Sequence, residues 1–160
     1  MNLTGKAALV TGGTKGIGAA TAKKLATLGA DVAILGRRDN EGARASREAI
    51  EAEGRRSHMI VADMANPYDA ARAVDETVVA FGGIDILVHN AGGGYVGGFL
   101  DIQSADWNRL FDVHVHAAFH LCRTALPHMK ARGGGAVVFV SSVSGLRGVP
   151  NIIPYGVVKS

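Results

Sequence analysis

The chain has 160 residues, of which 17 are lysine or arginine and 14 are aspartate or glutamate, so its formal net charge is +3. This length holds one domain with a proper core, and 48% hydrophobic residues with 22 glycines are typical of a globular, loop-rich α/β protein. The basic residues are scattered and no apolar run reaches the ~18 residues of a membrane span, so we expect a soluble, cytoplasmic protein that binds neither nucleic acid nor membrane.

The stretch from Ala7 to Gly29 predicts a strand, a glycine-rich turn and a helix in direct succession. Its first residues, Ala7 to Val10, are apolar and uncharged, as in a strand buried on both faces. The turn carries glycines at positions 12, 16 and 18. The helix that follows has apolar residues at Ile17, Ala20, Leu25 and Leu28. Glycines let the backbone approach a pyrophosphate closely and a helix N-terminus favours an anion, so the stretch predicts a dinucleotide-binding turn.

Four further apolar runs predict strands along the rest of the chain, with helical stretches between them. They are Asp31 to Leu35, His58 to Ala62, Ile84 to His89 and Ala136 to Ser141. Strands that alternate with helices are joined by right-handed crossovers into a parallel sheet. The chain is therefore expected to form one α/β domain over residues 1–160, with a Rossmann-like doubly wound parallel sheet.

Three of the predicted helices have recognisable N-termini. Asp39 or Asn40 can cap a helix that runs to about residue 53. Asn66 can cap the next one, which has Pro67 at its first position. Ser104 can cap a long helix that reaches about residue 132.

The end of the second predicted strand bears on the choice of dinucleotide. An acidic residue there would bind the ribose 2′-hydroxyl of NAD, whereas an arginine accommodates the 2′-phosphate of NADP. Gly36 occupies the expected acidic position, Arg37 and Arg38 follow it, and Lys15 in the glycine turn adds a further cation. This pattern favours NADP(H), while Asp39 keeps NAD(H) as the alternative.

Three groups of residues, in this order along the chain, resemble the motifs of the short-chain dehydrogenase/reductase family. The turn from Thr11 to Gly18 is similar to the family's TGxxxGxG, and the segment from His89 to Gly92 is similar to its NNAG with histidine at the first position. Ser142 and the segment from Tyr155 to Lys159 match the family's serine and YxxxK. The resemblance implies about five strands in the order 3-2-1-4-5.

The resemblance also implies which residues form the site. The cofactor-binding set is Gly12, Thr14, Lys15, Gly16, Ile17, Gly18, Arg37, Arg38, Asp63, Asn90, Ala91, Gly92, Tyr155 and Lys159. Within it, Asp63 would contact the adenine and Lys159 the nicotinamide ribose. For catalysis, Ser142 would hydrogen-bond the substrate oxygen and Tyr155 would exchange its proton. Four-residue spacing places Tyr155 and Lys159 on one face of a helix, where the ammonium favours the ionised phenol.

His114 stands where the family carries a fourth catalytic residue, an asparagine thought to hold a water in a proton relay. Histidine can both donate and accept a proton, so His114 is either a substitute relay or a tolerated loss. His116 and His120 are four residues apart on the same predicted helix, but no third ligand of suitable spacing accompanies them, and we expect no metal site. Cys122, the only cysteine, excludes an internal disulfide and is expected to be a small buried thiol.

The predicted helix 104–132 is apolar on most of its circumference. A helix of this kind needs cover beyond its own sheet, and the resemblance implies pairing between subunits through it, so we expect a homo-oligomer, a dimer or tetramer. The alternative is that neighbouring helices cover this surface within one subunit.

The resemblance covers only the N-terminal part of the family pattern. Relatives continue after the catalytic lysine through further strands and a lid over the substrate, and without these the run from Ala136 to Val140 forms an uncovered sheet edge. We therefore expect a fragment, or a chain completed by a partner. Residues 93–100 and 143–153 would face the substrate without naming it.

Three hypotheses for function follow from these patterns. The first is an NADP(H)-dependent oxidoreductase that interconverts a secondary alcohol and a ketone by hydride transfer, with small-molecule carbonyls such as 3-oxoacyl thioesters as substrates. The second is a catalytically disabled dinucleotide-binding module. The third is an interaction subunit that assembles with a longer relative.

Overall fold

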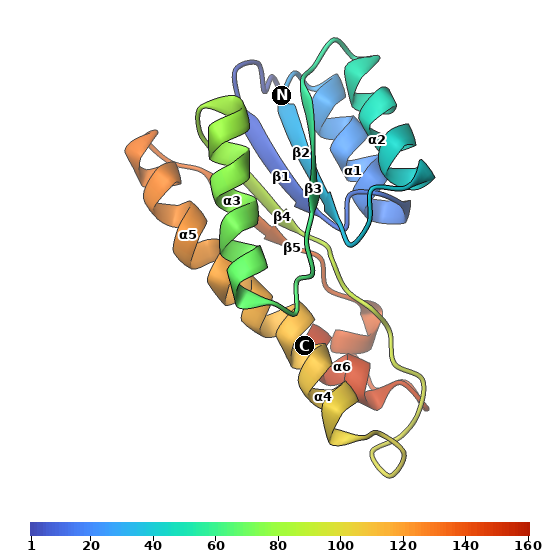
Figure 1. Ribbon diagram of the computed structural model, residues 1–160. Helices are drawn as coiled ribbons and strands as arrows, with labels where there is room; N and C mark the ends of the chain where they lie inside the picture. Colours follow the sequence, from blue (N-terminus) through green and yellow to red (C-terminus); the bar gives the residue numbers. More distant parts are fainter.

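A five-stranded sheet forms the centre of the computed structural model, which describes residues 1–160 (Figure 1). All neighbouring strands are parallel and lie in the order β3-β2-β1-β4-β5. The predicted doubly wound sheet and its strand order are thereby confirmed. The strands are β1 (Ala7–Thr11), β2 (Asp31–Gly36), β3 (Ser57–Val61), β4 (Ile86–His89) and β5 (Ala136–Phe139).

Burial falls from the middle of the sheet to its β5 edge. Every residue of β1 is buried, and its Val10 lies in register with Ile34 of β2 and Val88 of β4. A strand covered on both faces needs apolar residues on both, which explains the uncharged run in its sequence. At the β5 edge, Val138 and Phe139 are 48% and 55% exposed.

Two helical layers cover the sheet. Helices α1 (Gly16–Thr27) and α2 (Glu41–Glu51) lie on one face, whereas α3 (Pro67–Phe81) and α5 (Ala117–Ala131) lie on the other (Figure 1). Helices α4 (Ser104–Phe111) and α6 (Ile153–Lys159) contact each other beyond the carboxyl ends of the strands. The two layers leave that end of the sheet to loops and helix termini.

The predicted helix starts are correct in two of three cases. The Asn40 side chain accepts a hydrogen bond from the amide of Ala43 and caps α2, and the Asn66 side chain accepts one from the amide of Tyr68 and caps α3. The prediction for Ser104 is wrong, because the first helical hydrogen bond runs from the Trp107 amide to the carbonyl of Gln103. Ser104 is therefore the first helical residue, and the extended Gln103 precedes it without a side-chain cap.

The apolar stripe predicted for α1 differs from the face that the helix buries. Ile17 is 67% exposed, while the buried residues of α1 are Gly18, Ala22 and Ala26. A Cβ on Gly18 would lie 2.1 Å from the carbonyl oxygen of Gly12. The residues on this face of α1 must therefore have small side chains for the helix to pack against the glycine turn. Close approach, and not hydrophobic size, decides which side of α1 packs inward.

The predicted long helix has the expected length but contains a π-turn. Residues Asp112–His116, between α4 and α5, form a wider turn in which the amide of Ala117 bonds to the carbonyl of Asp112, five residues back. π-turns are rare and occur often at functional sites. The buried side chains of α5 include Leu121 and Ala125, whereas Phe119 and Leu126 are more than half exposed.

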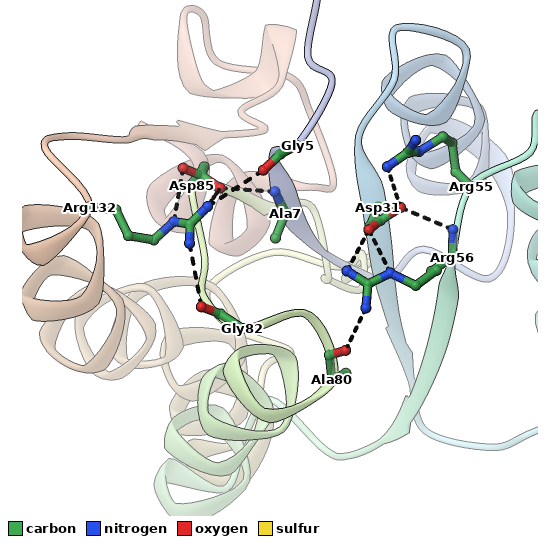
Figure 2. A network of polar contacts seen from close by, with 9 residues as sticks. All are labelled: Gly5, Ala7, Asp31, Arg55, Arg56, Ala80, Gly82, Asp85 and Arg132. Atoms are coloured by element: carbon green, nitrogen blue, oxygen red, sulfur yellow. Dashed lines mark hydrogen bonds and ion pairs between the residues drawn. The ribbon is translucent and has the colours of Figure 1, made fainter.

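The amino ends of the strands are joined by two ion-pair networks (Figure 2). The buried carboxylate of Asp31 accepts hydrogen bonds from Arg55 and Arg56. The buried carboxylate of Asp85 accepts from the amide of Ala7 at 2.9 Å and from Arg132 at 3.0 and 3.1 Å. Because β1, β2 and β4 begin here, the networks fix where the central strands start.

Two further features concern the remaining sequence predictions. Helices long and apolar enough to cross a membrane are absent from the structure. Cys122 is free and packs half-buried against the core, so the thiol that the sequence predicts to be buried is only partly covered, and this burial raises its pKa.

Candidate active site

The glycine turn lies between the end of β1 and the start of α1. Gly12 and Gly16 have positive φ angles of 65° and 54°, which side chains other than glycine adopt rarely. Lys15 precedes α1 without a side-chain cap, and the first turn of α1 contains no acidic residue. The unpaired amides of that turn can therefore receive an anion such as a phosphate.

Asn90 joins the end of β4 to this turn. Its side-chain amide donates to the carbonyls of Thr11 at 3.1 Å and Gly12 at 3.2 Å. A Cβ on Gly12 would lie 2.9 Å from the same amide, so this position excludes a larger residue. Asn90 thus ties the end of β4 to the glycine turn that follows β1.

A cavity of about 580 Å³ opens above the carboxyl ends of β1, β2 and β4, where ligands bind in open parallel sheets. It brings together many of the sequence-predicted residues, which belong to five separate segments of the chain. These are Gly12, Thr14, Lys15, Gly16, Ile17, Arg37, Asp63, Asn90, Ala91, Gly92 and His114. Gly18 lies buried beneath the turn, and Arg38 lies outside the cavity lining.

Arg37 and Asp39 face different surroundings at the end of β2. Arg37 lines the cavity, whereas the carboxylate of Asp39 pairs with Arg47 of α2 at 3.2 Å. A Cβ on Gly36 would lie 2.7 Å from a methyl carbon of Thr14, so an acidic residue at position 36 would require the Thr14 side chain to move. The cavity is cationic at this corner.

Asp63 holds an ion pair across the edge of the cavity. Its carboxylate accepts from Arg109 of α4 at 2.9 Å and from the amide of Ala65 at 3.0 Å. Burial alone would raise the pKa of Asp63, but the hydrogen bond from Arg109 and the others it accepts outweigh this and lower the pKa. Asp63 is therefore a carboxylate at neutral pH.

Tyr155 and Lys159 lie on α6, next to the end of the cavity that His114 lines. The ring of His114 meets that of Tyr155 edge-on at a centroid distance of 5.7 Å. The Nζ atom of Lys159 lies 5.9 Å from the Tyr155 ring centroid and donates to the carbonyl of Val140 at 2.6 Å. Ser142 precedes a short 3₁₀ turn (Val143–Gly145), and its hydroxyl accepts from the amide of Ser144 at 3.2 Å.

His114 is held tightly among these residues. Its Nε2 atom lies 3.0 Å from the carbonyl oxygen and 3.3 Å from the amide nitrogen of Gly93. A Cβ on Gly92 would lie 2.2 Å from the imidazole carbon Cε1, so only glycine leaves room for the ring. Burial, together with the nearby Lys159 ammonium, lowers the pKa of His114. Burial also lowers the pKa of Lys159.

Thr11, His89 and Arg109 lie outside the set of site residues that the sequence predicts. Thr11 and His89 are buried beside Asn90, and Arg109 lines the cavity with Leu110. Spacing gives no signal for Arg109, because an α-helix would turn a residue five positions before His114 about 140° away from it, and only the structure brings both to the same cavity. His116, considered above as a metal ligand, pairs with Asp112 at 2.9 Å instead.

Comparisons with known proteins agree with this arrangement. The chain matches the family model of the short chain dehydrogenases over residues 6–160. Dehydrogenase/reductase SDR family member 4 of Caenorhabditis elegans is 37% identical over 158 residues, which are 98% of this chain and 60% of that protein. The bovine protein of the same name is 36% identical, over 99% of this chain and 57% of its own length. The chain thus spans about 60% of the curated relatives it matches.

Solved structures place the fold in the same family. A short chain dehydrogenase from Burkholderia cenocepacia in complex with NADP has a TM-score of 0.92 and 40% identity, over 99% of this chain and 64% of that one. NAD⁺-bound xylitol dehydrogenase has a TM-score of 0.91 and 32% identity, over 99% of this chain and 61% of that one. Since the family model matches almost from end to end, and strand order and glycine turn agree with it, the chain belongs to the short chain dehydrogenase family.

Proposed function

We propose that the chain binds NADP(H) and takes part in the interconversion of a secondary alcohol and a ketone. The observation that carries this proposal is the position of His114, which lines the 580 Å³ cavity and also contacts Tyr155 on α6. One residue therefore borders both a dinucleotide-sized cavity and a phenol that can exchange a proton. Relatives of similar sequence include structures with NADP and with NAD⁺.

The cavity suits the phosphates of NADP(H). The uncapped N-terminus of α1 offers amides to the pyrophosphate, and Asn90 and the glycines keep the backbone close enough for contact. Arg37 and Lys15 provide positive charge where a 2′-phosphate would need it. Asp39, the residue that would favour NAD(H), is paired with Arg47 and lies outside the cavity lining.

The proposed roles in catalysis rest on the resemblance to the family's motifs, and the positions of Tyr155, Lys159 and His114 support them. When bound, the nicotinamide supplies or accepts the hydride. Tyr155 donates its phenolic proton to the substrate oxygen during reduction, and Ser142 hydrogen-bonds that oxygen. Lys159 holds positive charge beside the Tyr155 ring, and His114 borders the same space. The substrate is a small carbonyl compound or alcohol, with 3-oxoacyl thioesters among the classes to test.

Cofactor choice is tested by fluorescence titration of NADPH and NADH onto the chain and onto Arg37→Ala. We expect tighter binding of NADPH, and a loss of about tenfold or more in NADPH affinity for Arg37→Ala with little change for NADH. Arg38→Ala is the matched control, because Arg38 is the adjacent arginine and does not line the cavity. Preference for NADH, or equal effects of the two variants, contradicts the proposed cofactor.

Catalysis is tested with Tyr155→Phe, which removes only the hydroxyl. We expect NADPH-dependent carbonyl turnover to fall by about 10²–10⁴-fold, while NADPH binding persists. Tyr68→Phe serves as control, since Tyr68 is 83% exposed on α3. NADPH binding without turnover by the unaltered chain supports the dinucleotide-binding module instead, and binding of neither dinucleotide supports the interaction subunit.

A further inference from the structure

His89 and Thr11 form a buried polar pair at the ends of β4 and β1. The Thr11 hydroxyl oxygen accepts hydrogen bonds from the amides of Asn90 at 3.1 Å and Ala91 at 3.0 Å. A hydroxyl oxygen has two lone pairs and one hydrogen, so both lone pairs are used. The remaining contact, 2.9 Å to Nδ1 of His89, must therefore be the one in which Thr11 donates. Nδ1 of His89 is the acceptor and carries no proton.

The other ring nitrogen of His89 reaches the π-turn. Neutral imidazole carries one proton, which is then on Nε2, and Nε2 lies 3.1 Å from the carbonyl oxygen of Val113. Burial lowers the pKa of His89 to about 4, so the ring stays neutral at neutral pH. The ring thus accepts a hydrogen bond from the end of β1 through Nδ1 and donates one to the backbone of the long helix through Nε2.

The π-turn leaves the carbonyl of Val113 without its usual helical hydrogen bond. In an α-helix the amide of Ala117 would bond to the carbonyl of Val113, four residues back. Here that amide bonds to Asp112 instead. The helix therefore skips the Val113 carbonyl, and His89 supplies the missing donor. An unsatisfied carbonyl in this place would cost free energy, so the bond stabilises the turn.

The residue directly after Val113 is His114, whose ring occupies the space above Gly92 and meets Tyr155. The direction in which the His114 side chain points depends on the backbone conformation of the π-turn. We propose that His89 is a positioning residue of the active site, whose Nε2–H bond to the skipped Val113 carbonyl holds the π-turn and thereby the His114 ring beside Tyr155. The expected effect on catalysis rests on the proposed function, whereas the expected position of the His114 ring does not.

Two substitutions separate the bonds of the ring. In His89→Asn the side-chain oxygen can replace Nδ1 as the acceptor from Thr11, but the shorter side chain cannot reach Val113. In His89→Gln the terminal amide can replace Nε2 as the donor to Val113, while the acceptor for Thr11 is displaced. A role limited to packing the strand ends predicts that Asn is tolerated better, whereas positioning of the π-turn predicts that Gln is.

The primary measurement is nitrogen-15 NMR of the imidazole rings in the chain without dinucleotide. In the unaltered chain we expect His89 as the Nε2–H tautomer, and a signal from the Nδ1–H tautomer overturns the proposal even if neither variant folds. In His89→Asn we expect the titration of His114 to move up toward its ordinary value near 6.5, because the ring leaves its buried position. In His89→Gln it should stay low, and equal shifts in both variants contradict the proposal.

Kinetics provide the second measurement. We expect His89→Asn to lower the kcat for carbonyl reduction by about tenfold, with the KM for NADPH within about twofold of the unaltered chain, and His89→Gln to restore most of the loss. An unchanged kcat in a folded His89→Asn overturns the positioning role. If the unaltered chain binds no NADPH, the proposed function fails, and the NMR result still decides the structural part.

Discussion

The two ends of the parallel sheet are built from opposite kinds of polar group. At the amino ends, the carboxylates of Asp31 and Asp85 are only 8% and 3% exposed and each accepts from several charged or backbone donors (Figure 2). At the carboxyl ends, the buried polar side chains are Thr11, His89 and His114, and around them lie glycines, uncapped helix amides and a cavity. The buried carboxylates of one end are paired within the protein, whereas the other end leaves groups available to a ligand.

This difference shows how one sheet separates stability from binding. At the amino end the hydrogen bonds from the arginines and backbone amides outweigh burial, so the pKa values of Asp31 and Asp85 are lowered and both remain charged. At the carboxyl end burial dominates, the pKa of His89 falls, and no charge has to be paired. A ligand with several phosphates therefore meets the cationic side chains of Lys15 and Arg37 above a buried network that is neutral.

The largest expected effect comes from Asp85→Asn, at the amino end. The substitution leaves Arg132 and Lys6 without their carboxylate, and removal of one partner from a buried ion pair costs about 3–5 kcal/mol. We expect the free energy of unfolding in urea to fall by about that amount, while the folded fraction keeps its affinity for NADPH. A loss of affinity with unchanged stability would reverse the roles assigned to the two ends.

Glu41→Gln on α2 is the control for that variant. Its ion pair with Arg44 joins side chains that are 84% and 57% exposed, and such pairs contribute about 0–1 kcal/mol. A comparable cost for both substitutions would show that burial of Asp85 is not what makes its network important.

The next effect separates the two ends by pH. The pKa of His89 is about 4 in the folded chain and near 6.5 when unfolded, so the unfolded state binds more protons between these values. His89 therefore reduces stability by about 3 kcal/mol as pH falls from 6.5 to 4, at about 1.4 kcal/mol per unit. Asp31 and Asp85, whose pKa values lie below the ordinary 3.8, keep their contribution through this window and lose it only at lower pH.

A plot of the free energy of unfolding in urea against pH should thus fall in two steps on the acid side, an upper limb between pH 6.5 and 4 and a lower limb below pH 4. His89→Gln should reduce the slope of the upper limb and leave the share of His114, whose pKa burial also lowers, whereas His128→Gln, which removes a histidine from the last turns of α5, should leave the limb in place. A single limb that begins below pH 4 in the unaltered chain would mean that His89 is not buried as a neutral ring.

The smallest expected effect concerns Arg109→Met, which removes the ion pair at the edge of the cavity. Arg109 and Asp63 are 49% and 39% exposed, so the loss in unfolding free energy should be below about 1 kcal/mol. The pKa of Asp63 should rise toward its ordinary value, because Arg109 supplies the main hydrogen bond that offsets burial. A loss as large as that of Asp85→Asn would show that charge pairing stabilises both ends equally.

The fold was largely predictable because it follows from local patterns. Uniform apolar runs indicate strands covered on both faces, and Asn40 and Asn66 act as caps through bonds to amides two or three residues away. The prediction failed for α1, where Gly18, Ala22 and Ala26 pack inward and Ile17 does not. Periodicity reports hydrophobic size, whereas the packing of this helix is decided by how closely two backbones approach.

The candidate site was predictable in its residue types and less so in its connections. The glycines and residues 90–92 are recognised from spacing within one segment. The bonds of Asp63 to Arg109 and of His89 to Val113 join segments 46 and 24 residues apart, and no local pattern encodes them. The π-turn is hidden for a related reason, since its residues fit the continuous helix that the sequence predicts from 104 to 132.

The π-turn also corrects the rotational phase of the long helix. Leu110 and Met129 are both buried although nineteen residues separate them. At about 100° per residue, an uninterrupted α-helix would turn the second side chain about 100° away from the first. One wider turn absorbs that excess, so the buried side chains from α4 to the end of α5 follow a single line. Deletion of one residue between Asp112 and His116 would therefore make the π-turn unnecessary, because the two side chains would then lie eighteen residues apart, which is five full turns at about 100° per residue, and an ordinary α-helix would keep the same face of α5 toward the sheet.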